Sequence, residues 1–145
     1  MCDRTSLKVG KSQVVKPKDE PVAKIEKFED IKAWQTARDL VSAVYRVSSE
    51  GKFGKDFGLR DQIRRASVSM MSNIAEGFER CSDKVFHRFL YIAKGSAGEV
   101  RSHLFVALDL GYVTTDEFHD LCSRAEEASK ASSGFINYLA PKGPM

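Results

Sequence analysis

The sequence contains little proline, and its few prolines lie close to its ends. Pro17, Pro21, Pro141 and Pro144 are the four prolines among 145 residues, so the long middle of the chain has none. Proline removes a backbone donor and breaks helices, so a long stretch without it favours long helices. No stretch of useful length shows the apolar–polar alternation of a half-buried strand. The sequence therefore predicts an all-α protein.

Cysteines and long apolar runs are also scarce. The three cysteines, Cys2, Cys81 and Cys122, form no CxxC pair. Their odd number, without a recognisable signal peptide, predicts reduced thiols in a cytoplasmic protein. No apolar run approaches the roughly 20 residues that a membrane-spanning helix needs, so we expect no membrane contact.

Residues that build metal and catalytic sites are few and scattered. His87, His103 and His119 lack the i, i+4 pairing of a helical metal site. No glycine-rich phosphate loop follows a predicted strand, and no set of nucleophile, base and orienting residue follows from the spacing. We therefore expect no metal, no cofactor and no enzymatic activity.

One enzymatic alternative rests on two acidic pairs, Glu76-x-x-Glu79 and Glu117-x-x-Asp120. They resemble the paired acidic motifs of the all-α nucleotide pyrophosphohydrolases, in which carboxylates hold Mg²⁺ on a helical bundle. Such a magnesium site requires all four carboxylates at one end of the bundle, facing inward.

The net charge of +3 is distributed unevenly along the chain. Residues 1–27 hold seven Lys/Arg against four Asp/Glu, and the remaining residues hold sixteen of each sign. Within that neutral part, residues 57–108 carry a net +3 and residues 109–145 a net −3. A charge separation of this kind suits nucleic-acid binding and subunit docking equally well.

Apolar residues at helical spacing predict four helices within a single domain. The expected helices span residues 30–50, 59–77, 83–110 and 115 to the residue before Pro141. Short connections between them predict an antiparallel up-down-up-down four-helix bundle over residues 28–140. Residues 1–27 are predicted to form a flexible basic arm, and residues 141–145 a C-terminal tail.

Residues that typically begin or end helices support these helix bounds. Asp30 and Ser82 are suited to cap a first turn, and Thr114-x-x-Glu117 reads as a capping box. Glycine and proline are expected to end helices at the following positions: Gly51, Gly54, Gly58, Gly77, Gly111 and Pro141.

Two glycines lie inside the third predicted helix, at Gly95 and Gly98. Glycine inside a helix costs about 1 kcal/mol relative to alanine, so its presence calls for a reason. We expect close approach by the Trp34 ring or by another subunit, with tight packing as the simplest explanation. Trp34 itself is predicted to be a core or interface anchor rather than a base-stacking residue.

Basic residues on the second and third predicted helices are the candidate nucleic-acid contacts. Arg60 and Arg64 are four residues apart and share one helical face, as do Lys84 and Arg88. Phosphates favour such clusters because binding releases counterions. The full candidate set is Arg60, Arg64, Arg65, Arg80, Lys84, Arg88, Lys94 and Arg101.

The alternative is that several of these arginines form ion pairs within the fold. Arg64 or Arg65 would then pair with Glu76 or Glu99, and Arg80 with Glu79 or Asp83. We expect Arg65 to be the structural residue, because it lies beside the apolar stripe of its helix. The nearby Ser72-Asn73-Glu76 cluster is expected to satisfy buried polar neighbours or a subunit contact rather than to form a site.

A series of segments between Phe28 and Tyr138 forms a recognisable pattern over about three-quarters of the chain. The segments are, in this order, Phe28-Glu29-Asp30-Ile31-Lys32-Ala33-Trp34-Gln35, Phe57-Gly58-Leu59, Gln62-Ile63-Arg64-Arg65-Ala66, Ser72-Asn73-Ile74-Ala75-Glu76-Gly77, Phe86-x-x-Phe89-Leu90, Ala93-x-Gly95-Ser96 and Leu108-Asp109-Leu110-Gly111-Tyr112. In these segments the chain resembles the four-helix bundle family of 23S ribosomal RNA intervening-sequence proteins.

The resemblance implies an antiparallel bundle that assembles into a homopentameric ring, without an established catalytic activity. A related branch of the family comprises the accessory variability determinants of diversity-generating retroelements, which bind a reverse transcriptase and its RNA. We therefore expect a non-enzymatic scaffold that binds structured RNA, or an RNA–reverse transcriptase complex, through repeated basic surfaces. The alternative is a protein-interaction scaffold without nucleic acid, in which the basic middle of one subunit pairs with the acidic last helix of its neighbour.

Overall fold

The computed structural model describes residues 25–139, and within them every regular element is helical. A 3₁₀ turn, η1 (Phe28–Asp30), precedes five α-helices. They are α1 (Lys32–Val47), α2 (Gly51–Lys55), α3 (Phe57–Glu79), α4 (Asp83–Asp109) and α5 (Thr115–Leu139). The predicted all-α class is confirmed. The predicted C-terminal tail and nearly all of the predicted arm lie outside the described residues.

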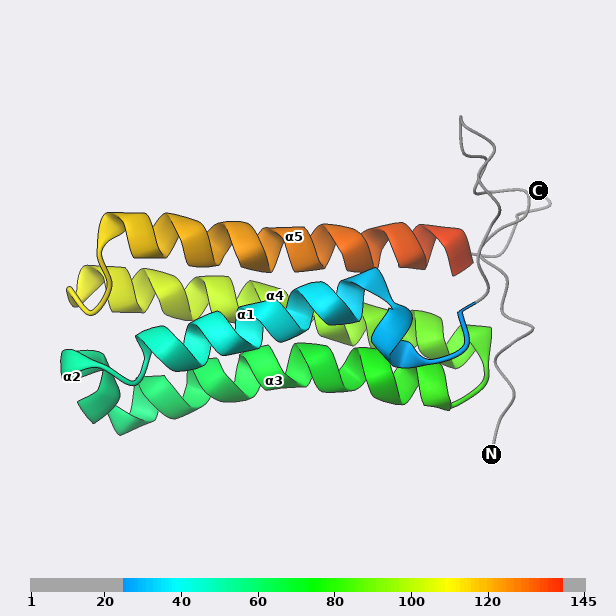
Figure 1. Cartoon of the computed structure of the whole chain (residues 1–145), viewed down its shortest axis with the longest axis horizontal. Helices are drawn as coiled ribbons and strands as arrows, with labels where there is room; N and C mark the ends of the chain where they lie inside the picture. Colours follow the sequence, from blue (N-terminus) through cyan, green and yellow to red (C-terminus); the bar gives the residue numbers. More distant parts are fainter. Residues whose placement is uncertain (1–24, 140–145) are drawn as a thin grey trace.

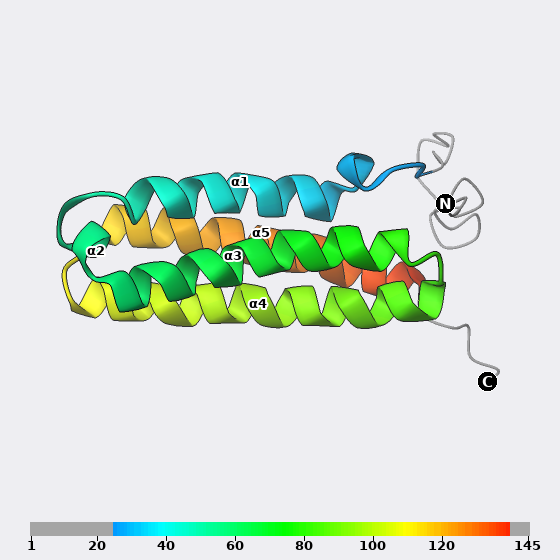
Figure 2. The same ribbon diagram turned by 90° about the horizontal axis from the view of Figure 1, so that it is seen from below.

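The four long helices lie side by side along the long axis of the molecule (Figures 1 and 2). The short helix α2 lies at the end where α1 connects to α3 (Figure 1). Contacting rings join α4 to α5 at Phe86 and Phe135 and again at Phe105 and Phe118. None of the helices in residues 25–139 has both the length and the apolarity that a membrane crossing demands.

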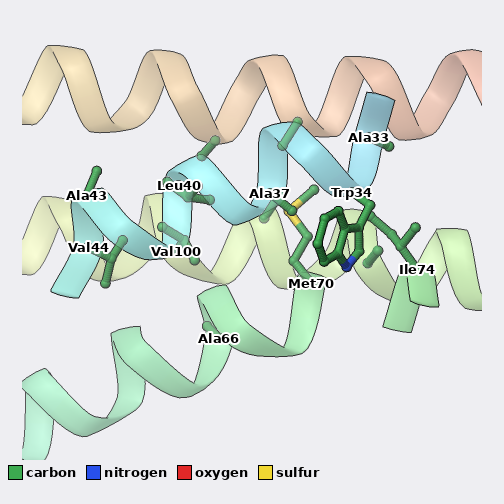
Figure 3. Packing of buried hydrophobic residues seen from close by; sticks show 14 of the residues in the cluster. Ala33, Trp34, Ala37, Leu40, Ala43, Val44, Ala66, Met70, Ile74 and Val100 are labelled. Atoms are coloured by element: carbon green, nitrogen blue, oxygen red, sulfur yellow. The ribbon is translucent and has the colours of Figure 1, made fainter. Parts of the chain in front are cut away.

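Each long helix presents an apolar face to one shared core. Trp34 of α1 is 8% exposed and lies beside Met70 and Ile74 of α3 (Figure 3). Burial of a large apolar side chain contributes about 1.5–3 kcal/mol, so these faces hold the bundle together. The prediction that Trp34 anchors the core is confirmed, and Ile25, from the predicted arm, also packs against this core.

Three of the predicted helix signals act as expected. The Ser82 hydroxyl accepts a hydrogen bond from the Val85 N–H at 3.3 Å. In the capping box, the Thr114 hydroxyl accepts from the Glu117 N–H and the Glu117 carboxylate accepts from the Thr114 N–H, at 3.0 and 2.8 Å. Gly111 follows α4 with a φ of +74°, a left-handed conformation that favours glycine.

Other predicted signals are wrong. Asp30 caps nothing, because it lies in η1 and the residue before α1 is Ile31. Residues 51–55 form α2 rather than a break, and Gly58 lies in the first turn of α3. Gly77 lies inside α3, where a built Cβ would stand 2.5 Å from the Phe89 Cβ, so glycine serves helix packing there and not helix termination.

The glycines of α4 also differ from the prediction. A Cβ built on Gly95 or Gly98 would meet no atom within 4 Å, so neither glycine packs against Trp34 or any other described residue. Both glycines are exposed on the outer side of α4.

At the α2 end of the bundle, one hydrogen bond joins the connection between α4 and α5 to the connection between α2 and α3. The Tyr112 hydroxyl donates to Asp56 Oδ2 at 2.9 Å, and Asp56 Oδ1 accepts from the Leu59 N–H in the first turn of α3. These two bonds, the Leu59 bond first, lower the pKa of Asp56 below its ordinary value. The same carboxylate raises the pKa of Tyr112.

The cysteines are not equivalent. Cys122 is a free, half-buried thiol of α5, and burial raises its pKa against the opposing effect of Arg101. Cys81 is not a free thiol. The prediction of reduced cysteines is therefore wrong for Cys81.

Candidate nucleic-acid interface

All eight candidate cations lie on α3, on α4 or in the turn between them. These two helices pack against each other along their length (Figure 2). The structure divides the eight residues into a group whose charged ends are held by other groups of the chain and a group without such partners among residues 25–139.

Arg64 is the most firmly held of the candidates. Its Nε donates to the buried Ser48 Oγ at 2.8 Å, and its Nη2 donates to Ser49 Oγ at 3.0 Å and, more weakly, to the Tyr45 carbonyl at 3.5 Å. The guanidinium also lies over the Tyr45 ring, 4.5 Å from its centroid. These contacts clamp α3 to the end of α1. Neither Glu76 nor Glu99 is the partner, so the predicted ion pair is wrong for Arg64.

Arg60 is held at the start of α3. Its Nε donates to Asp61 Oδ1 at 3.0 Å, and its Nη1 donates to the Gly54 carbonyl of α2 at 3.1 Å. The guanidinium lies 4.6 Å from the centroid of the exposed Phe57 ring. Arg60 therefore joins α2 to α3, and it shares with Arg64 the side of α3 that faces α1 and α2.

Arg80 and Arg101 form exposed ion pairs. Arg80 Nη2 lies 2.7 Å from Glu76 Oε2, four residues earlier, and its guanidinium also covers the Phe89 ring. Glu76 is thus the acid that Arg80 pairs with in the structure, where Glu79 or Asp83 was expected. Arg101 approaches Glu126 of α5 at 3.7 Å. Exposed pairs of this kind contribute about 0–1 kcal/mol.

Four candidates have no internal partner among residues 25–139: Arg65, Lys84, Arg88 and Lys94 make no hydrogen bond, ion pair or ring contact there. Arg65, Lys84 and Arg88 are exposed, and Lys94 is half-buried. Arg65 lines two open grooves, one of about 540 Å³ beside Tyr45 and Val68, and one of about 310 Å³ beside Glu99 and His103. The prediction that Arg65 is the structural arginine is therefore wrong, and its neighbour Arg64 has that role.

The Ser72-Asn73-Glu76 cluster does not converge on one point. Asn73 Nδ2 donates to the Ser69 carbonyl at 2.8 Å and to Ser69 Oγ at 3.0 Å, and Ser69 Oγ lies 3.0 Å from the buried Ser96 Oγ of α4. This chain of polar groups joins α3 to α4, as expected for Asn73. Ser72 is exposed and Glu76 pairs with Arg80.

Sequence reasoning missed the polar groups that hold the arginines. Ser48, Ser49 and the Tyr45 carbonyl lie at the end of α1, and nothing in their spacing marks them as partners of an arginine on α3. Ser69 and Ser96 are likewise serines on two helices that meet only in the fold.

The acidic pairs of the enzymatic alternative do not meet. Glu76 and Glu79 lie in the last turn of α3, whereas Glu117 and Asp120 lie in the first turns of α5. These two helix ends stand at opposite ends of the bundle (Figure 1). Residues 25–139 contain no group of three or more His, Cys, Asp or Glu side chains placed to hold a metal ion. The four carboxylates therefore cannot share one magnesium ion in this fold.

Comparisons with known proteins cover most of the described residues. The family model for 23S rRNA-intervening sequence proteins matches residues 29–134. A crystal structure of a protein of unknown function from the S23 ribosomal protein family of Bacteroides thetaiotaomicron shares the fold, with a TM-score of 0.66 and 21% sequence identity. The match covers 72% of this chain and 97% of that one. A search of the curated proteins found no match.

Proposed function

Because the chain belongs to the family of 23S rRNA-intervening sequence proteins, we propose that it is a non-enzymatic scaffold that binds structured RNA through the outward side of α3 and α4. The observation that carries this proposal is the set of candidate cations without internal partners: Arg65, Lys84, Arg88 and Lys94. A cation that is already solvated gives up no internal bond when it meets a phosphate, whereas Arg64 would have to break its contacts with α1.

Phosphate contacts made by these cations would supply affinity without reading sequence. Each phosphate neutralised by a lysine or arginine releases counterions, so the affinity falls steeply with salt. Arg80 would add a donor by exchanging its exposed pair with Glu76 for a phosphate. Specificity for structured RNA would then come from the shape of the RNA and from the spacing of basic clusters, as in other proteins that contact A-form backbones.

The family resemblance adds two elements to the proposal. The helices of the subunit run antiparallel, and the subunits form a ring of five. A ring repeats each cationic cluster, so a modest surface on one subunit becomes an extended one on the assembly. A reverse transcriptase with its RNA is the partner complex that the related retroelement branch implies.

A gel shift with a labelled RNA hairpin at low salt tests the proposal. The test variant combines Arg65→Glu, Lys84→Glu, Arg88→Glu and Lys94→Glu, and we expect it to lose RNA retention. The control variant combines Lys32→Glu, Arg46→Glu, Lys52→Glu and Lys130→Glu, which change net charge by the same amount at cations outside the candidate set. Equal loss of binding in both variants, or retention in the first, would count against this surface.

The alternative function is a protein-interaction scaffold without nucleic acid. The observation that favours it is the exposed apolar outer side of α4, where Tyr91 and Phe105 are each more than half exposed, as is Leu110 directly after the helix. The ultraviolet absorbance ratio of the purified protein, read with its native mass, separates the two functions. A protein free of nucleic acid that also fails to shift the hairpin would be the interaction scaffold.

A further inference from the structure

A polar groove lies between α3 and α4, within the surface proposed to bind RNA. Its volume is about 310 Å³, and it is lined by Gln62, Arg65, Ala66, Ser69, Glu99 and His103. Four of these residues belong to α3 and two to α4. Pockets that hold small ligands have volumes of roughly 300–1,000 Å³, so the groove is large enough to hold a small ring system.

Two opposite charges line this groove without pairing. Arg65 and Glu99 are both exposed, and neither forms an ion pair or a hydrogen bond with the other or with any residue in the range 25–139. A carboxylate only accepts hydrogen bonds, and a guanidinium only donates them. The groove therefore offers a ligand one acceptor and one donor that the fold does not use.

The imidazole of His103 adds a third polar group to the wall of the groove. Its Nδ1 is buried and has no hydrogen-bond partner among the described residues. Buried polar atoms nearly always have a partner in folded proteins, so this nitrogen indicates an unmet hydrogen bond. Because no hydrogen bond holds the ring in place, the ring can turn about its bond to Cβ and present a nitrogen to a molecule in the groove.

Contacts between the two helices fix the shape of the groove. Ser69 Oγ lies 3.0 Å from the buried Ser96 Oγ of α4, and it accepts a hydrogen bond from Asn73 Nδ2 at 3.0 Å. Ala66, beside it in the groove, is buried. The spacing of α3 and α4 is therefore held at this level. A site built on two packed helices positions its polar groups more precisely than a site on loops.

We propose that this groove binds the base of one unpaired guanosine of the RNA, an inference that rests on the proposed function and specifies the ligand of part of that surface. Guanine carries two neighbouring donors, N1–H and the exocyclic amine, on its Watson–Crick edge, and they match the two oxygens of the Glu99 carboxylate. Adenine, cytosine and uracil each have a single donor group on that edge. The nucleotide must be unpaired, because base pairing uses the same edge.

Arg65 is placed to hold the phosphate of the same nucleotide. Its side chain lines this groove and also the larger groove beside Tyr45 and Val68, so it stands at the border between the two. An acidic peptide would match Arg65 but not Glu99, and a basic peptide would match Glu99 but not Arg65. A guanosine nucleotide carries both a pair of donors and an anionic phosphate, so it matches both side chains.

Hairpins that differ at one loop nucleotide test the base contact. The loop is made of uridines except at one position, which carries guanosine, adenosine or inosine, a nucleoside that lacks the exocyclic amine of guanosine. We expect the native protein to bind the guanosine hairpin about tenfold more tightly than the adenosine hairpin, because a bidentate contact discriminates by that order. The inosine hairpin should lie between them. Fluorescence anisotropy at one fixed salt concentration gives the three dissociation constants.

Glu99→Gln tests the residue that reads the base. The amide keeps one acceptor and replaces the other with a donor, so the preference for guanosine over adenosine should be lost. Because Glu99 has no internal partner within residues 25–139, the subunit should keep its fold. The matched control is Glu127→Gln on α5, which makes the same change of charge at an exposed acid outside the groove. This control should keep the native preference.

The outcomes separate this inference from the proposed function. Equal affinity of the native protein for all three hairpins would overturn the guanosine site while leaving RNA binding intact. A Glu99→Gln variant that keeps the full preference would also overturn it. A native protein that binds none of the hairpins would overturn both proposals.

Discussion

The inward and outward sides of α3 use the same residue type for different purposes. Arg64 and Arg65 are neighbours in sequence, but one helical step of about 100° directs them into different surroundings. Arg64 donates three hydrogen bonds to the end of α1, whereas Arg65 is exposed and lines two open grooves. A run of arginines therefore does not define a binding surface. The internal partners of each guanidinium decide which charge is available to a ligand.

A buried glycine of α3, Gly77, and an exposed glycine of α5, Gly134, show a similar contrast. They give the largest expected difference in the free energy of unfolding. Gly77→Ala places a Cβ only 2.5 Å from the Phe89 Cβ, so it should lower the free energy of unfolding by about 1–3 kcal/mol. Gly134→Ala on the outer side of α5 meets no atom and should raise it by up to about 1 kcal/mol. Urea unfolding of both variants measures the difference, and equal effects would contradict the packing at Gly77.

Substitutions of Arg64 and Arg65 give the next largest expected difference in the free energy of unfolding. Arg64→Ala removes a charged donor from Ser48 and Ser49 and leaves the buried Ser48 hydroxyl without that partner, so we expect a loss of about 1–3 kcal/mol. Arg65→Ala removes no internal contact and should change the free energy of unfolding by less than about 0.5 kcal/mol. If chemical denaturation found the two variants equally stable, the division between held and free arginines would be wrong.

The hydrogen bond between Tyr112 and Asp56 should make stability depend on pH. The folded pKa of Asp56 is lowered, so its contribution is present above the ordinary aspartate pKa and is lost as the pH falls through the folded value. The folded pKa of Tyr112 is raised, so its contribution is present below the ordinary tyrosine pKa and is lost as the pH rises through the folded value.

Removal of the Tyr112 hydroxyl isolates this effect. Tyr112→Phe should lower Tm near neutral pH, and the difference from the native protein should disappear in acid once Asp56 is protonated in both. The hydroxyl of Tyr45 makes no hydrogen bond within the described residues, so Tyr45→Phe serves as the control. A Tm difference that persists unchanged into acid would contradict a role for the Asp56 carboxylate. Thermal melts at a series of pH values supply the comparison.

The ion pair of Arg80 and Glu76 should give the smallest effect. Both side chains are about half exposed, so the pair is screened by water and salt. Glu76→Gln should therefore change the free energy of unfolding by less than about 1 kcal/mol, while freeing Arg80 for phosphate and slightly strengthening RNA binding. A large loss of stability, or weaker RNA binding with the fold intact, would show that the pair has a structural role.

Sequence patterns predicted the helices well where the signal was local. Ser82, the Thr114–Glu117 pair and Gly111 act through hydrogen bonds or backbone conformation within a few residues, and all three appear in the structure. Gly77 misled the prediction, because its small size is required by Phe89 on another helix. The spacing of apolar residues also gave no sign of α2, a helix of five residues that begins at Gly51, with a φ of +56°.

The candidate site was predictable in composition but not in detail. Charge counts placed the cationic residues on the second and third long helices, and this placement is correct. Which of them face solvent depends on how α3 is rotated against α1, and that rotation is set by core packing between helices distant in sequence. The partners Ser48 and Ser49 carry no pattern that points to Arg64. Gly95 and Gly98 are unusual residues for a helix interior, and only the fold shows that they face outward from α4.

The salt dependence of RNA binding is the sharpest test of whether the cations without internal partners contact phosphate. Dissociation constants for one RNA hairpin, measured over a series of salt concentrations, give a slope that decreases by about 0.7–0.9 for each phosphate contact removed. We expect that replacing Arg65, Lys84, Arg88 and Lys94 by serine lowers the slope by about 3, whereas Arg64→Ala leaves it unchanged. A slope that falls with Arg64→Ala and not with the four serine substitutions would contradict this binding surface, as would a native protein without salt-dependent binding.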